Sequence, residues 1–265
     1  MDASSPNRFF VLAEEVRRHD RDRFALILLA PRAKREALSA LYVFDRMLAR
    51  IAATEPMLLR LRLQWWRDAL GTTGTRQAED VPVLDGLAEA VARHGLPLSG
   101  LERLIDAREA MLDDGPPADG AVLEERAESD RLLLDLALTV LGVGDESARQ
   151  AARHAGTAWG LTARLRSLST APPALILQSL AAVPGMNPAD AARLVAERAS
   201  GHLAAARALR DVVPKKAVPV LLTVCLAETY LRRLEKAGYV LSAPGWAETR
   251  PQPLRLAWMA WRGRY

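Results

Sequence analysis

The sequence predicts an all-α protein that folds as a single domain over residues 1–265. Half of the 265 residues are hydrophobic, and apolar residues recur at helical spacing along most of the chain. Proline and glycine stand at the ends of these segments, and no stretch shows the alternating β-branched pattern of a strand. Because the predicted helices are long and their connections short, a helical bundle around one core is expected.

The first half of the chain predicts six helices. Asp20 or Asp22 can cap the second of them, and Pro31 ends it because proline cannot continue a helix. Pro56 suits a first helical turn, and Gly95 suits a helix C-terminus. The predicted helices span residues 9–19, 23–29, 33–53, 57–70, 81–94 and 99–113.

The second half continues the pattern after a loop at 113–120, where the letters Asp-Asp-Gly-Pro-Pro favour a turn. Gly142 to Gly144 form another turn, and Pro172 with Pro173 ends the longest helix. Five further helices are predicted, over residues 123–141, 146–168, 188–209, 217–238 and 253–261.

The C-terminal tail, residues 253–265, combines aromatic and basic side chains in a short amphipathic pattern. Trp258, Trp261 and Tyr265 alternate there with arginines. Such a helix can lie in a membrane interface or contact a partner. The alternative is that the tail packs on the domain and closes the bundle.

Composition and charge exclude several classes of protein. The net charge of +4 comes from arginines spread along the predicted helices, and no tight basic cluster with interleaved aromatics stands out, which argues against nucleic-acid binding. Cys225 is the only cysteine, so no intramolecular disulfide can form, and its apolar neighbours predict a buried side chain. No apolar run of membrane-spanning length and no secretory signal is evident. We therefore expect a cytoplasmic protein, with peripheral contact to the inner face of the membrane left open.

Several short motifs follow one another in a fixed order. They are D-R-F at 22–24, L-A-P at 29–31, A-L-Y-V-F at 40–44, L-Q-W-W-R-D-A-L at 63–70 and G-T-A-W-G-L-T-A-R-L-R-S at 156–167. In this order they resemble the squalene/phytoene synthase family, from about Arg21 to the last long helix and best in the first seventy residues. The resemblance implies a helical bundle of the isoprenoid (terpenoid) synthase type.

In that family, two facing helices carry aspartates that hold magnesium and the diphosphate of a prenyl substrate. Magnesium prefers oxygen ligands and neutralises the charge of the leaving group. Aspartates three or four residues apart on a helix point to one side, so two such helices can form a metal cage.

This chain lacks the carboxylates at those positions. The glutamine and asparagine of the second family motif fall on Gly160 and Ala163. The family aspartates fall on Ala49, Arg50, Ala53, Ser167 and, for the last one, near Ala171. No catalytic residue and no metal site is therefore expected. By the resemblance, Arg46 and Arg166 remain as candidate diphosphate or anion contacts, unless they form structural pairs with nearby acids.

The resemblance also predicts which residues line a central cavity: Tyr42, Asp45, Ala49, Ala53, Gly160, Ala163 and Ser167. Asp45 stands one turn before Ala49 on a similar helix face, which leaves a displaced metal cage as an alternative. No second acid stands near the other motif, and a cage made from one helix would bind metal poorly.

Three functions follow from this comparison. One branch of the family lacks the aspartates, and its members assist the assembly of respiratory complex I. Residues 41–44, 55–56 and 63–70 resemble that branch, which implies a non-catalytic factor that binds a protein partner, a membrane lipid or a prenyl lipid. The alternative is an active prenyl synthase that condenses two prenyl diphosphates head-to-head with magnesium. A third option is a carrier that holds a prenyl lipid in the cavity. Only the synthase would need a cofactor.

Overall fold

The computed structural model describes residues 5–51, 56–71, 81–113, 115–181, 185–250 and 252–265. In these ranges the chain forms α-helices and two short 3₁₀ turns without any strand, which confirms the all-α prediction. The elements are α1 Ser5–His19, α2 Arg21–Leu29, η1 Arg32–Lys34, α3 Arg35–Ala49, α4 Pro56–Gly71, α5 Pro82–His94, α6 Leu98–Asp113, α7 Gly120–Glu125, α8 Glu128–Val140, α9 Glu146–Ser167, α10 Pro173–Ser179, α11 Pro188–Ala208, η2 Lys215–Ala217, α12 Val218–Leu221, α13 Thr223–Lys236 and α14 Pro253–Trp261.

Local signals in the sequence fix several helix ends. The Asp20 carboxylate accepts a hydrogen bond from the backbone N–H of Arg23 at 2.9 Å and caps α2. Gly95 ends α5 in the left-handed conformation, with φ of 64°, which glycine adopts without strain. The helix predicted over residues 33–53 is shorter in the structure. The 3₁₀ turn η1 precedes it, and α3 ends at Ala49.

Two predicted helices are divided and one helix was missed. The segment 123–141 breaks after Glu125 into α7 and α8, which lets Ala127 pack against Gly160. The segment 217–238 breaks at Leu222, where the N–H of Cys225 bonds to a carbonyl only three residues back. Helix α10 starts at Pro173, because proline is favoured in the first turn of a helix. The pattern of Pro172 and Pro173 predicted only the end of the preceding helix.

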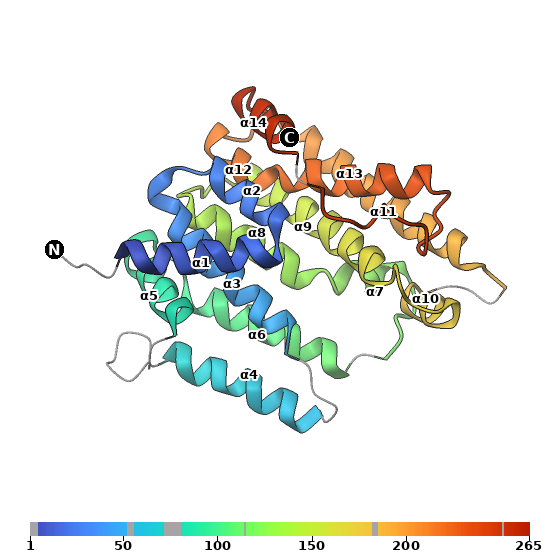
Figure 1. Cartoon of the computed structure of the whole chain (residues 1–265), viewed down its shortest axis with the longest axis horizontal. Helices are drawn as coiled ribbons and strands as arrows, with labels where there is room; N and C mark the ends of the chain where they lie inside the picture. Colours follow the sequence, from blue (N-terminus) through green and yellow to red (C-terminus); the bar gives the residue numbers. More distant parts are fainter. Residues whose placement is uncertain (1–4, 52–55, 72–80, 114, 182–184, 251) are drawn as a thin grey trace.

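Helix α9 lies at the centre of the bundle, as Figure 1 shows, and packs against α8, α11 and α13. Helix α3 packs against α1, α5 and α8, and α4 lies on α6 at one end of the molecule. The buried hydrophobic side chains form one continuous cluster, which includes Ile27, Phe44, Leu165 and Leu234. Facing sides of α3 and α9 therefore stand near the middle of the molecule.

Close contact between α8 and α9 depends on two glycines. A Cβ atom on Gly156 would stand 2.7 Å from the Cα of Arg131, and one on Gly160 would stand 2.7 Å from the Cβ of Ala127. Neither neighbour can move without shifting a helix backbone. The family glutamine position is thus occupied by a residue whose lack of a side chain allows the helices to meet.

The burial prediction for Cys225 is confirmed, and the two adjacent tryptophans of α4 differ in burial. Cys225 is buried, as predicted. Trp66 is a core residue that contacts Phe44 edge-on, with ring centroids 5.3 Å apart, but its neighbour Trp65 is half exposed. Among the described residues, no helix combines the length and the apolar character needed to cross a membrane.

Candidate functional site

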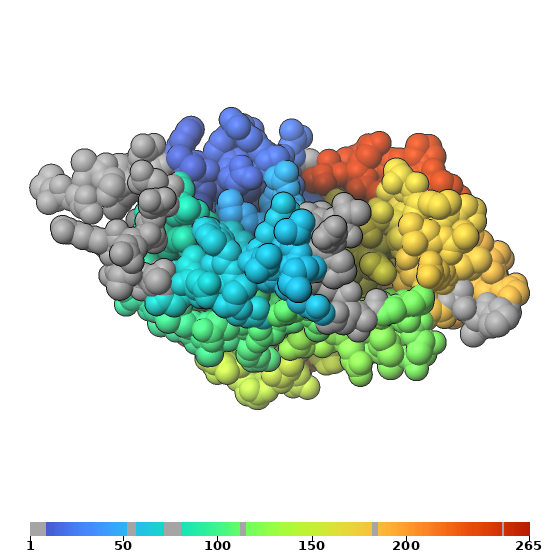
Figure 2. All heavy atoms as spheres, turned by 90° about the horizontal axis from the view of Figure 1, so that it is seen from below, coloured from blue at the N-terminus to red at the C-terminus, as the bar shows by residue number. Residues whose placement is uncertain are grey.

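A cavity of about 690 Å³ lies between the helices that carry the family motifs. Asp45 and Ala49 reach it from α3, and Gly160, Ala163 and Ser167 reach it from α9. Figure 2 shows the surface hollowed beside α10, which contributes Leu175, Gln178 and Ser179 to the wall. The structure thus brings together, in one cavity, residues from two motifs more than a hundred positions apart.

Tyr42, which was predicted to line the cavity, does not do so, and neither does Ala171, the last family aspartate position. Tyr42 is buried below the cavity wall, with its ring 5.3 Å from the guanidinium carbon of Arg23, and burial raises its pKa to about 12. It stands two turns before Ala49 on α3, and at that depth Arg23 fills the space. Ala171 packs half-buried on the core and does not line the cavity. Ala53 lies outside the described residues.

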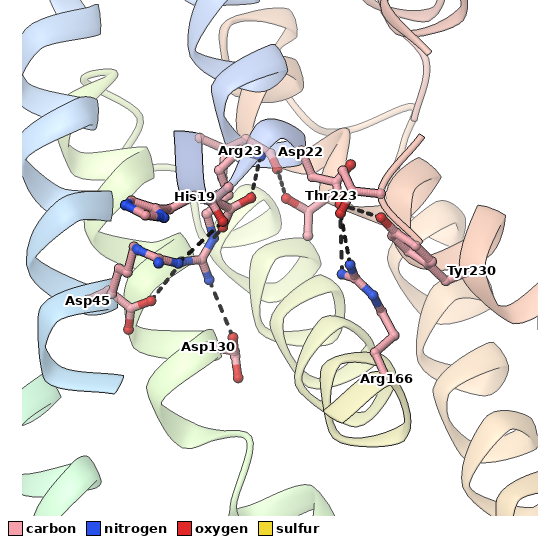
Figure 3. Close-up of polar contacts among 12 residues, drawn as sticks. His19, Asp22, Arg23, Asp45, Asp130, Arg166, Thr223 and Tyr230 are labelled. Carbon is pink, nitrogen blue, oxygen red and sulfur yellow. Dashed lines mark hydrogen bonds and ion pairs between the residues drawn. The ribbon is translucent and has the colours of Figure 1, made fainter. Parts of the chain in front are cut away.

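Arg23 lies at the centre of a carboxylate cluster formed by Asp20, Asp45 and Asp130 (Figure 3). Its guanidinium lies 2.7 Å from Asp45, 3.5 Å from Asp20 and 3.7 Å from Asp130, measured between the nearest nitrogen and oxygen atoms. Arg108 of α6 approaches the other oxygen of Asp45 at 3.1 Å. Both oxygens of Asp45 therefore accept hydrogen bonds from arginine.

The surroundings shift the pKa values of Asp45 and Asp130 in opposite directions. Burial alone would raise the pKa of Asp45, but the guanidinium groups of Arg23 and Arg108 outweigh it and hold that pKa below its usual range. Burial raises the pKa of Asp130 to about 6, against the pull of Arg108. Asp45 therefore keeps its negative charge to lower pH than an ordinary aspartate does, whereas Asp130 becomes protonated in a mildly acidic medium.

Arg166, one of the two predicted anion contacts, is tied into the protein. Its guanidinium carbon lies 3.8 Å from the ring centroid of Tyr230, and it donates hydrogen bonds to the Ala247 carbonyl at 3.3 Å and to Thr249 Oγ1 at 3.1 Å. It also pairs with the buried Asp22 at 3.7 Å, which accepts a hydrogen bond from Tyr230 (Figure 3). Arg166 borders the cavity, but its main contacts are structural. It therefore fits the interpretation as a structural ion pair better than the interpretation as an anion contact.

Arg46 and Arg164 are less engaged. Arg46 donates a long hydrogen bond of 3.3 Å to the His19 carbonyl, and burial together with the nearby Arg50 lowers its pKa. The Arg164 guanidinium borders the cavity without a hydrogen bond or ion pair to any described residue, and burial together with the nearby Arg126 lowers its pKa. Sequence reasoning missed Arg164. Its place four residues after Gly160 on α9 could have revealed it.

The described part of the cavity wall carries an excess of positive charge. Six arginines face three aspartates: Arg23, Arg46, Arg108, Arg126, Arg164 and Arg166 against Asp20, Asp45 and Asp130. The rest of the lining is largely apolar, with Met111, Leu123, Leu161 and Leu175 among its side chains. Such a cavity suits an anion with an apolar part.

A helical bundle with two motif helices facing each other across a central cavity has the architecture of the isoprenoid synthases. The chain belongs to the squalene/phytoene synthase family, whose sequence profile matches residues 16–262. Its fold is similar to that of squalene synthase HpnC from Alicyclobacillus acidocaldarius, with a TM-score of 0.72 and 19% identity over 90% of this chain and 97% of that one. A dehydrosqualene synthase gives a TM-score of 0.74 at 12% identity, over 97% and 95% of the two chains.

Relatives from animals are named as an assembly factor of complex I and not as a synthase. The chain is 30% identical to rat NADH dehydrogenase (ubiquinone) complex I, assembly factor 6, over 98% of this chain and 84% of the relative. The human protein of that name is 28% identical, over 95% and 81% of the two chains. The Drosophila melanogaster homolog is 31% identical, over 86% and 75%.

The cavity does not fit the magnesium ions that the family implies. Among the described residues, no group of three acidic, histidine or cysteine side chains is placed to hold a metal ion. Asp45 and Asp130 do face each other, but the Arg23 guanidinium lies between them and takes the place a cation would need. A magnesium ion there would have to displace an ion-paired arginine from a wall that is already cationic.

Proposed function

We propose that this protein is a non-catalytic member of the squalene/phytoene synthase family that assists the assembly of respiratory complex I by binding a protein partner. The observation that carries the proposal is the arginine-filled carboxylate cluster in place of a metal cage. The names of the relatives, similar over nearly the whole chain, supply the assembly role. We place this activity in the cytoplasm, in peripheral contact with the inner face of the membrane.

Prenyl synthase chemistry has little support in this cavity. Ionisation of an allylic diphosphate needs concentrated positive charge on the leaving group, which the family supplies with magnesium. Arginines could bind a diphosphate, but the most central one, Arg23, is neutralised by surrounding aspartates. The ligand set of the family is missing from both motif helices at Ala49, Ala163 and Ser167.

Deletion of the gene in its host is expected to lower the complex I content of membranes at least severalfold. The measurement is NADH:quinone oxidoreductase activity together with native gel electrophoresis, with succinate:quinone activity as the internal control. A plasmid copy should restore activity. Unchanged complex I in the deletion strain would contradict the proposal, as would magnesium-dependent diphosphate release from farnesyl diphosphate by the purified protein.

A second candidate function rests on Arg164. We propose that the cavity holds an anionic amphiphile, such as a prenyl lipid with a phosphate head, without metal. The Arg164 guanidinium forms no hydrogen bond or ion pair with any described residue, and desolvating a cation without a counter-ion is costly. An incoming phosphate would relieve that cost, and the apolar wall would accept the chain.

Farnesyl phosphate is expected to bind the purified protein in EDTA, and farnesol about tenfold or more weakly, because a charge-assisted hydrogen bond contributes about 1.5–3 kcal/mol. Arg164→Gln should weaken the binding of farnesyl phosphate by a similar factor, as measured by isothermal titration calorimetry. Arg193→Gln, which removes an exposed arginine of α11, serves as the matched control. Equal affinity of the Arg164 variant, or binding only with magnesium, would contradict this function.

A further inference from the structure

Helix α14 turns its largest apolar side chains away from the protein. Leu254, Trp258 and Trp261 stand at helical spacing on one face and are 86%, 51% and 83% exposed, whereas Leu256 on the opposite face is 2% exposed. Burial of a tryptophan is normally strongly favourable. An orientation that leaves two of them in water therefore indicates that this face has another partner.

The orientation of α14 is fixed by contacts on both of its flanks. Leu256 is buried in the core, and α14 packs against α2. The C-terminal Tyr265 is buried, and its hydroxyl donates a hydrogen bond to the Ala206 carbonyl at 3.4 Å. Upstream, Trp246 is buried and donates a hydrogen bond to the Leu241 carbonyl at 2.7 Å. The exposed stripe therefore lies on a helix that is packed firmly on the rest of the fold.

The rim of this stripe is basic. Residues 252–265 contain three arginines and no acid, and the Arg262 guanidinium carbon lies 4.9 Å from the ring centroid of Trp258. The side chain of Lys215 runs beside Gly263, where a Cβ atom would stand 3.5 Å from it. Asp211 is exposed on the neighbouring turn, but it pairs with Arg210 at 3.8 Å.

We infer that the α14 surface, formed by Leu254, Trp258, Trp261, Arg262 and Arg264, docks on a bilayer that contains anionic lipid. Tryptophan prefers the boundary between headgroups and acyl chains, and arginines beside it can reach lipid phosphates. Apolar burial and attraction to anionic lipid add together in such a helix. This inference deepens the membrane contact in the proposed function and rests on that part of it alone.

A protein partner is the other occupant that an aromatic and arginine-rich face could bind. The charge pattern favours the bilayer, because arginine surrounds the stripe without any acid in the same segment. The chain also exposes a second apolar stripe on α4, with Leu61 and Trp65 57% and 50% exposed. Figure 1 shows α4 at the end of the molecule opposite to α14, so the two stripes can be tested separately.

Sedimentation with vesicles tests the inference on the full-length protein. It should sediment with vesicles of phosphatidylcholine and about one-third phosphatidylglycerol, and much less with phosphatidylcholine alone. The double variant Trp258→Ser, Trp261→Ser should lose at least about tenfold in affinity, since both apolar anchors are gone. Arg262→Gln with Arg264→Gln should abolish the preference for anionic vesicles, and added salt should act likewise.

The control is Leu61→Ser with Trp65→Ser on α4, which removes two exposed apolar side chains from the other stripe and should leave sedimentation unchanged. Equal thermal unfolding midpoints for all variants would show that the fold is retained. Failure of the full-length protein to sediment, or equal loss in the α4 control, would overturn the inference and favour a protein occupant. Neither result would bear on complex I content in the deletion strain, so the assembly role stands or falls separately.

Discussion

Replacement of Arg23 by glutamine is expected to lower the free energy of unfolding by about 3–5 kcal/mol at pH 8, because it leaves buried carboxylates without their counter-ion. Arg23 lies 2.7 Å from Asp45 and 3.7 Å from Asp130, in a largely buried site. Arg108 would remain as the partner of Asp45. Asp130 would lose its ion pair with Arg23 and keep the weaker support of the surrounding arginines, chiefly Arg108, although burial already raises its pKa to about 6 with Arg23 present.

The loss should depend on pH with a definite sign. In the wild-type protein the pKa of Asp45 is lowered, so its ion pairs contribute stability above the unfolded pKa, which is lost as the pH falls through the folded value. Without Arg23 the folded pKa of both aspartates should rise. A raised folded pKa preserves stability at low pH and removes it as the pH increases. The variant should therefore be closest to wild type near pH 5 and furthest from it near pH 8.

Urea unfolding at both pH values measures this effect. Arg193→Gln serves as the control, because its ion pair with Asp190 is half exposed and contributes about 0.5 kcal/mol or less. A loss under about 1 kcal/mol at pH 8, or the same loss at both pH values, would show that Arg23 does not balance the buried aspartates.

Gly156→Ala is expected to destabilise the protein by about 1–3 kcal/mol, although alanine favours helices more than glycine does. The new Cβ atom would stand 2.7 Å from the Cα and 2.8 Å from the backbone nitrogen of Arg131. Backbone atoms of a packed helix cannot move aside as a flexible side chain does. Helices α8 and α9 would therefore have to separate, which would loosen the wall that carries Asp130.

Gly201→Ala on α11 is the matched substitution, because its Cβ atom would have no neighbour within 4 Å. It should raise the free energy of unfolding by about 0.4–1 kcal/mol through the lower entropy of the unfolded chain. Thermal or urea unfolding of the two variants gives the comparison. Stabilisation by both substitutions would mean that α8 and α9 are not in close contact at Gly156.

The central cavity shows how far sequence patterns reach. Ala49, Ala163 and Ser167 could be assigned to it because helical spacing and motif order place them on faces that the family directs inward. Tyr42 shares that face, but it lies too deep, and only the position of Arg23 between its ring and the cavity shows why. Whether Arg166 was free or paired also could not be decided, since its partners Tyr230 and Thr249 are distant in sequence.

By itself, the sequence determined the helical class, most helix positions and the loss of the family aspartates, because periodicity, capping residues and residue identity are local properties. Only the tertiary structure decided that Arg23 lies among Asp20, Asp45 and Asp130, that the Arg164 side chain borders the cavity without a hydrogen bond or ion pair to any described residue, and that the tryptophans of α14 face outward. Ion pairing and burial depend on which helices meet, and the packing of distant segments sets both.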